Sequence, residues 1–187
     1  MLKHAPMGQH HGFEPIPSFF NSLEKRFPTN CHFHQLGLSN EKGSSSFNHV
    51  ISNPGYSGMK KRKYDKPKEK DTSITIEIDL LDNILPKDFR VDFIKIDVEG
   101  AEFLVLEGAI KTIKRNQPII VFEHGLGGAD VYGIHPAQLF ELLNKECYLN
   151  VSTMKKWLNN ENSFSKKEFI EQFEKGLNYY FIAYPSK

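Results

Sequence analysis

The feature that most constrains the fold is the alternation of strand-like and helical segments in the second half of the chain. Residues 91–97 form a mostly apolar run, as in a buried parallel strand. Residues 99–115 follow with apolar side chains at helical spacing. We expect further elements at 118–122, 136–145 and 148–151, then a helix capped by Ser165 and Glu168, and a last strand at 179–183. This order predicts an α/β fold with a doubly wound, mostly parallel sheet.

The first half is less regular. We expect a short extended piece that ends near Glu14, a helix opened by Pro17, a strand over 31–38, a turn at 43–46 and a strand over 47–51. A basic and glycine-rich loop then covers 53–72. Within it, residues 60–70 carry seven basic and two acidic side chains, which fits a solvated loop, a localisation signal or a lid over an anionic substrate.

Composition narrows the class of protein. A length of 187 residues favours one domain over 1–187. The chain has 24 Lys and Arg residues against 23 Asp and Glu residues, so its charge is nearly balanced. This balance gives no indication of nucleic acid or an acidic membrane as a partner. No apolar run approaches the roughly 20 residues of a membrane span, the N-terminus lacks a signal-peptide pattern, and the two cysteines form no disulfide framework. A cytoplasmic location is expected.

Three expected strand ends carry acidic residues. Glu14 ends the first, Asp97 and Glu99 end the second, and Glu123 with His124 ends the third. Because ligands of open α/β sheets bind at the carboxyl ends of strands, these side chains mark a candidate site. The alternative is that they only cap helices. An acid at the position of Glu14 can hold a ribose diol, which fits NAD and S-adenosylmethionine equally well.

The segment around residues 91–102, Val-Asp-Phe-Ile-Lys-Ile-Asp-Val-Glu-Gly-Ala-Glu, closely resembles the signature of the FkbM family of methyltransferases. Matching segments lie at 13–17, 81–85, 105–109, 118–123 and 178–182, in the right order along the chain. The resemblance implies a Rossmann-like, class I methyltransferase fold and S-adenosylmethionine as cofactor. It also implies methylation of a hydroxyl group on a sugar or another small-molecule or glycan acceptor.

The resemblance also implies roles for individual residues. Glu14 would hold the ribose, Gly37, Leu38 and Ser39 would lie near the adenine, and Asp97 would face the methionine part or the acceptor. Family members carry a strand and a glycine loop before the position of Phe13. This chain starts at what looks like the tail of the following helix, so we expect the first strand to be missing and the cofactor to bind weakly.

Methyl transfer to an alcohol needs a base within hydrogen-bond reach of the hydroxyl. Asp97, Glu99 and His124 are the candidates, and His124 has an ordinary pKa near working pH. Lys95 interrupts an apolar strand, so we expect it either to pair with Glu123 or to reach solvent. The histidines show no convincing metal spacing, and no metal is expected.

Two other functions stay open at this point. The chain could be a truncated, non-catalytic relic domain that acts as a binding module. A NAD-dependent oxidoreductase is a more distant alternative, because no residues for hydride transfer are evident.

Loss of the first strand would also leave two central strands, the one at 93–97 and the one ending at Glu14, with unpaired edges. We expect these strands to close onto each other, to self-associate through the gap, or to leave the fold marginal.

Overall fold

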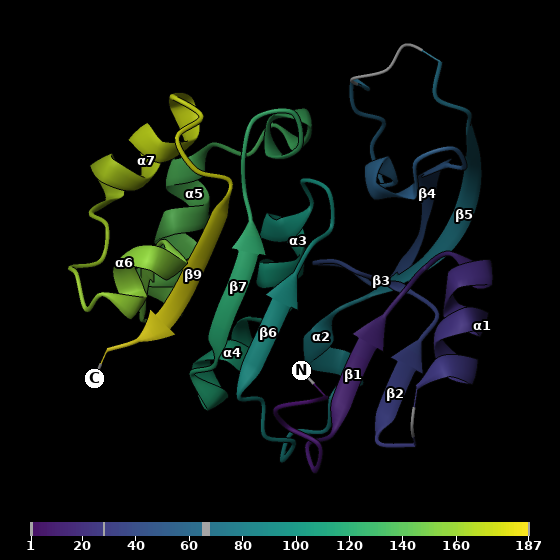
Figure 1. Cartoon of the computed structure of the whole chain (residues 1–187), viewed down its shortest axis with the longest axis horizontal. Helices are drawn as coiled ribbons and strands as arrows, with labels where there is room; N and C mark the ends of the chain where they lie inside the picture. Colours follow the sequence, from purple (N-terminus) through teal and green to yellow (C-terminus); the bar gives the residue numbers. More distant parts are fainter. Residues whose placement is uncertain (1, 28, 65–67, 187) are drawn as a thin grey trace.

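The computed structural model describes residues 2–27, 29–64 and 68–186. They form a mixed α/β fold in which strands β9, β7, β6, β1 and β2 succeed one another across the molecule (Figure 1). These strands belong to two separate sheets, and a third sheet completes the fold.

The largest sheet has four strands in the order β6-β7-β9-β8. Their bounds are β6 Phe93–Ile96, β7 Ile119–Glu123, β8 Leu149–Ser152 and β9 Tyr180–Pro185. β6 and β7 are parallel, whereas β9 runs antiparallel to both β7 and β8. The α/β class is therefore confirmed, but the sheets are mixed, and a doubly wound, mostly parallel arrangement is not confirmed. Apolar patterning located these strands but carries no information about the direction in which β9 pairs.

Helices follow the strands of this sheet as the sequence predicts, with shorter bounds. They are α3 Glu102–Glu107, α4 Ile110–Asn116, α5 Pro136–Glu141 with a π-helical turn at Leu142–Glu146, α6 Met154–Leu158 and α7 Lys166–Glu174. A short 3-10 turn, η2 Ala129–Tyr132, follows β7. The capping box of α7 is confirmed, since Ser165 and Glu168 exchange hydrogen bonds.

The single helix expected over 99–115 is divided between α3 and α4 at Gly108. A Cβ atom at this glycine would lie 1.9 Å from the carbonyl oxygen of Ser39. The division thus lets the helical segment pack directly on the backbone that follows β3 Gly37–Leu38.

The remaining strands form two small sheets. β1 His10–Phe13 pairs in parallel with β2 Cys31–His34, and α1 Pro17–Arg26 connects them with Pro17 in its first turn. β3 pairs in parallel with β5 Asp71–Asp79, and β4 Gly43–Val50 pairs antiparallel with β5. Two short helical turns, η1 Pro54–Tyr56 and α2 Leu81–Ile84, lie at the ends of these strands.

Two expectations for this region are wrong. The turn expected at 43–46 is the first half of β4, whose serines pair with residues of β5. Serine and glycine favour turns locally, but pairing along eight residues of β5 overrides that preference. The strand expected over 31–38 is two strands in different sheets, separated by a bend at residues 35–36.

β1 and β6 face each other across a gap (Figure 1). In the described part of the chain each pairs on one edge only, β1 with β2 and β6 with β7. Direct closure of the two strands, one of the outcomes expected from the sequence, is therefore wrong. β6 is also less buried than a central strand, with Phe93 40% exposed.

A single core of apolar side chains lies between the four-stranded sheet and its helices and includes Leu106, Ile113, Ile120, Phe122 and Leu143. A smaller cluster around Phe47 and Ile76 supports the sheet of β3, β4 and β5. Among the described residues, no helix is both long and apolar enough to cross a membrane.

Candidate functional site

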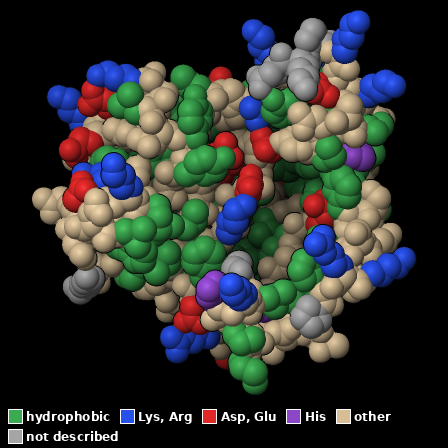
Figure 2. Space-filling model, viewed as in Figure 1, with side chains coloured by type: hydrophobic (Ala, Val, Ile, Leu, Met, Phe, Trp, Pro, Cys, Tyr) green, Lys and Arg blue, Asp and Glu red, His purple; other side chains and the backbone are tan. Residues whose placement is uncertain are grey.

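A cavity of about 1310 Å³ occupies the space between β1 and β6. Figure 2 shows a hollow in the middle of this face with hydrophobic side chains inside it. Five residues expected at the site line the cavity, namely Glu14, Gly37, Leu38, Asp97 and Glu99. Ser39, expected beside them, is 2% exposed and does not line it; its hydroxyl donates to the side chain of Asn40.

Glu14 follows directly on β1 and is half-buried at the edge of this cavity. The backbone N–H of Ile16 donates to its Oε1 atom at 2.7 Å. Burial raises the pKa of the Glu14 carboxyl, against the opposing effects of the Ile16 N–H and of His49. The other oxygen of the Glu14 carboxylate can accept hydrogen bonds from a ligand.

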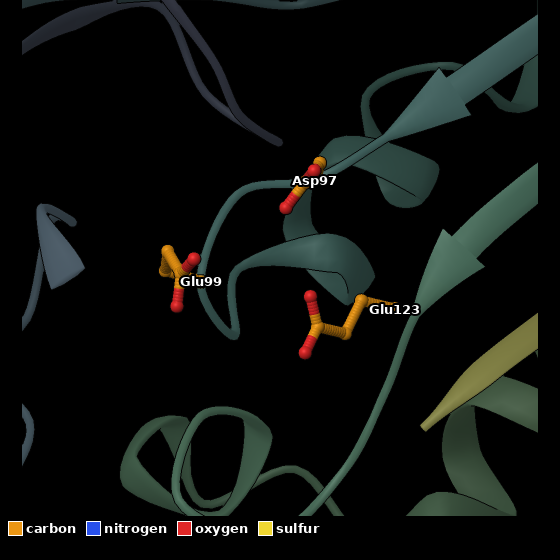
Figure 3. Close-up of side chains that lie close together, drawn as sticks. All are labelled: Asp97, Glu99 and Glu123. Atoms are coloured by element: carbon orange, nitrogen blue, oxygen red, sulfur yellow. The ribbon is translucent and has the colours of Figure 1, made fainter. Parts of the chain in front are cut away.

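Three carboxylates meet where β6 and β7 end (Figure 3). Asp97 follows β6, Glu99 stands in the loop after it, and Glu123 is the last residue of β7. One oxygen from each lies within 4.8 Å of the others. The sequence placed these acids at neighbouring strand ends, and parallel pairing of β6 with β7 brings them together.

Two cations flank this carboxylate cluster, which we define as Asp97, Glu99 and Glu123. Lys95 Nζ lies 2.6 Å from Asp97 Oδ2, and the Arg62 guanidinium pairs with Glu99 Oε2. The expected pairing of Lys95 with Glu123 is therefore wrong. Its side chain is 58% exposed, as the solvent-reaching alternative predicted, because β6 is the edge of its sheet.

Two carboxyls of the cluster, Glu99 and Glu123, have a raised pKa. Burial is the main cause of the raised pKa of Glu99, and Glu123 and Asp97 add to it while Arg62 opposes it. Burial also raises the pKa of Glu123, supported by Asp97 and opposed by Arg62 and Lys95. The cluster thus sets three carboxylates against two cationic side chains, Arg62 and Lys95.

A second, smaller cavity of about 80 Å³ adjoins the cluster and is lined by Glu99, Glu102, Glu123 and His124 among others. Glu102 is 1% exposed; its Oε1 accepts from the Gly100 N–H at 3.0 Å, and its Oε2 has no hydrogen-bond partner among the described residues. The pKa of Glu102 is raised to about 7, and burial is the main cause. No local pattern in the sequence marks Glu102 as buried, so a role for it at the site was not expected.

His124 is also 1% exposed and lies on this smaller cavity rather than on the large one. Its ring packs against Phe169 and Phe173, with centroids 5.9 and 4.8 Å away, and neither ring nitrogen has a partner among the described residues. Burial lowers the pKa of His124 to about 4. Such an imidazole is neutral at physiological pH but is a weak base.

The basic loop reaches the site through Arg62. The guanidinium of Arg62 lies 4.9 Å from the ring centroid of Tyr56, and Lys60 lies 5.1 Å from that of Tyr132, whose hydroxyl accepts from the Lys60 N–H. Part of the loop is thus packed on the molecule rather than solvated throughout. The segment 65–67 of the basic run lies outside the described residues. Arg62 was missed as a site residue because its contact with Glu99 spans 37 positions.

Comparisons with known proteins found a matching family and a similar fold. The family model that describes the methyltransferase FkbM domain matches residues 1–149 of this chain. The structure is similar to the crystal structure of methyltransferase FkbM from Methylobacillus flagellatus KT, with a TM-score of 0.52 and 14% sequence identity, over 94% of this chain and 36% of that chain. The chain thus spans about a third of the length of that protein. No protein with a curated description matches.

The mixed α/β fold is similar to that of the solved FkbM structure. The chain belongs to the FkbM methyltransferase family, as the sequence resemblance implied.

Proposed function

We propose that the chain acts as an S-adenosylmethionine-dependent methyltransferase on a hydroxyl group of a small-molecule or glycan acceptor. The observation that carries this proposal is the large cavity between β1 and β6, onto which Glu14, Gly37, Leu38, Asp97 and Glu99 converge.

The residues at the cavity suit such a cofactor. Glu14 has one oxygen engaged by the Ile16 N–H, and its other oxygen can accept from a ribose hydroxyl. Gly37 and Leu38 offer a small apolar surface close to Ile76, as a flat adenine ring requires. S-adenosylmethionine, when bound, supplies a methyl group on a sulfonium, and its transfer to an oxygen depends chiefly on alignment.

The acceptor hydroxyl must lose its proton during transfer. Asp97 and Glu99 are the members of the carboxylate cluster that line the large cavity, and either can take that proton. The raised pKa of Glu99 makes it a stronger base than an exposed glutamate. His124 is not part of this proposal, because it lines only the smaller cavity and has a low pKa.

Titration calorimetry with S-adenosylmethionine tests the proposal. Glu14→Gln should weaken binding about tenfold, because an amide replaces the charged acceptor and such a loss costs about 1.5 kcal/mol. Glu24→Gln is the matched control, since Glu24 is an exposed glutamate on α1 that does not line the cavity. NAD is the control ligand, because Glu14 alone cannot distinguish the two nucleosides.

Three results would contradict the proposal. Absence of heat with S-adenosylmethionine from a folded chain would favour the non-catalytic binding module instead. Equal binding by the Glu14→Gln and Glu24→Gln variants would remove Glu14 from the site. Tighter binding of NAD would favour an oxidoreductase.

A further inference from the structure

The carboxylate cluster has more acceptor oxygens than its neighbours use. Lys95 engages Asp97 through Oδ2, and Arg62 engages Glu99 through Oε2. The Glu123 carboxylate forms no hydrogen bond or ion pair with any described residue, although one of its oxygens lies within 4.8 Å of an oxygen of each other carboxylate. One oxygen on Asp97, one on Glu99 and both on Glu123 are therefore left for another ligand.

A second observation supports a bound ion or water beside the carboxylate cluster. Glu102 lines the small cavity next to Glu99 and Glu123 and is almost completely buried. Its Oε2 atom has no hydrogen-bond partner in the described part of the chain. A buried carboxylate oxygen without a partner is costly, so proteins seldom retain one unless an ion or water completes it.

We propose that Asp97, Glu99 and Glu123 bind a hard divalent cation of the Mg²⁺ or Mn²⁺ type, with the unpartnered oxygen of Glu102 directed at the same ion or at one of its waters. Oxygen ligands from carboxylates are those that Mg²⁺ and Mn²⁺ take. The position between a cavity of about 80 Å³ and one of about 1310 Å³ leaves space for waters or ligand oxygens in the remaining coordination positions.

The geometry favours a hard cation over zinc or copper. Those metals prefer nitrogen and sulfur ligands, and the ligand atoms that lie within 4.8 Å of one another here all belong to carboxylates, without His124. The expectation that no metal binds rested on histidine spacing and did not consider carboxylates alone. This site goes beyond the proposed function and does not depend on methyl transfer.

A cation here would also act on whatever occupies the large cavity, because Asp97 and Glu99 line that cavity as well. A hydroxyl oxygen bound to a divalent cation has a lowered pKa, which eases loss of its proton. The cation would thus provide a second means of activating an alcohol beside the carboxylates themselves.

Binding of Mn²⁺ to the chain without cofactor, followed by electron paramagnetic resonance, tests the site. We expect one Mn²⁺ per chain, displaced by Mg²⁺. Glu123→Gln should weaken Mn²⁺ binding about tenfold or more, since even loss of an outer-shell group costs 10–100-fold. Glu123 suits this test because it holds no described partner whose loss would disturb the fold.

Glu77→Gln is the matched control, because Glu77 is an exposed glutamate on β5 that lines neither cavity. Arg62→Gln should leave binding intact or strengthen it, because it removes a competing cation from Glu99. Absence of Mn²⁺ binding, or an equal loss in the Glu123 and Glu77 variants, would overturn the proposal. Since S-adenosylmethionine is omitted, failure here is separate from failure of the calorimetric test.

Discussion

Glu102 and His124 offer a sharp test of the electrostatics of the site, because burial moves their pKa values in opposite directions. The pKa of Glu102 is raised from 4.5 to about 7, and that of His124 is lowered from 6.5 to about 4. Both side chains are almost fully buried. Each difference corresponds to about 3 kcal/mol of folding free energy.

The two contributions have opposite signs between pH 4 and 7. Glu102 has a higher pKa in the folded chain, so its contribution is fully present below about pH 4.5 and is lost as the pH rises towards 7. His124 has a lower pKa in the folded chain, so its contribution is fully present above about pH 6.5 and is lost as the pH falls towards 4. In the unaltered protein the two largely cancel.

Single variants should expose each contribution. Relative to the unaltered chain, Glu102→Gln should gain about 2–3 kcal/mol in unfolding free energy between pH 4.5 and 7.5, because the contribution of His124 is then no longer offset by that of Glu102. His124→Phe should lose a similar amount over the same range, because Glu102 remains. Urea denaturation followed by Trp157 fluorescence, in buffer with EDTA to exclude metals, measures both. Parallel pH profiles for the two variants would refute the reasoning.

Three further predictions concern the fold. Gly108→Ala should lower the free energy of unfolding by about 3 kcal/mol or more, because the new Cβ would meet the Ser39 carbonyl oxygen. Gly55→Ala is the control and should cost little, since the nearest atom to a Cβ there is 3.7 Å away. Thermal denaturation compares the two variants. Ser165→Ala should lower the unfolding free energy by about 1 kcal/mol in urea titrations, because α7 loses its N-terminal cap, and an unchanged midpoint would count against the capping box. The unpaired edges of β1 and β6 should promote self-association, so light scattering should show a mass that rises with concentration, and a constant monomer mass would contradict this.

Local patterns predicted much of the second half of the chain. The apolar run ending at Asp97, the helical segment after it and the capping box of Ser165 all depend on neighbours within a few residues. The structure contains each of them, with two helices in place of the one expected over 99–115. The acids at strand ends were also predicted to share an edge, because parallel strands place their ends together. Pairing of β6 with β7 confirms this for Asp97 and Glu123.

The features that sequence reasoning missed depend on distant parts of the chain. Arg62 reaches Glu99 from a loop 37 positions away, and no local pattern indicates that contact. His124 is buried against Phe169 and Phe173 of α7, far along the chain. Glu102 lines the same small cavity as Gly128 in the loop after β7, and no local pattern predicts either arrangement. The pairing direction of β9 likewise cannot be read from its apolar side chains alone.

The geometry of the carboxylate cluster depends on two glycines that belong to different strand-end loops. Gly100 has φ 107°, and a Cβ there would lie 2.4 Å from the carbonyl carbon and oxygen of Gly128. The loop after β6 can therefore rest directly on the loop after β7. Glu99, just before this contact, has φ 55°, a left-handed conformation that costs a non-glycine residue about 1–2 kcal/mol. The same backbone conformation places the Glu99 carboxylate beside Arg62 and Glu123. The backbone strain at Glu99 therefore accompanies assembly of the carboxylate cluster.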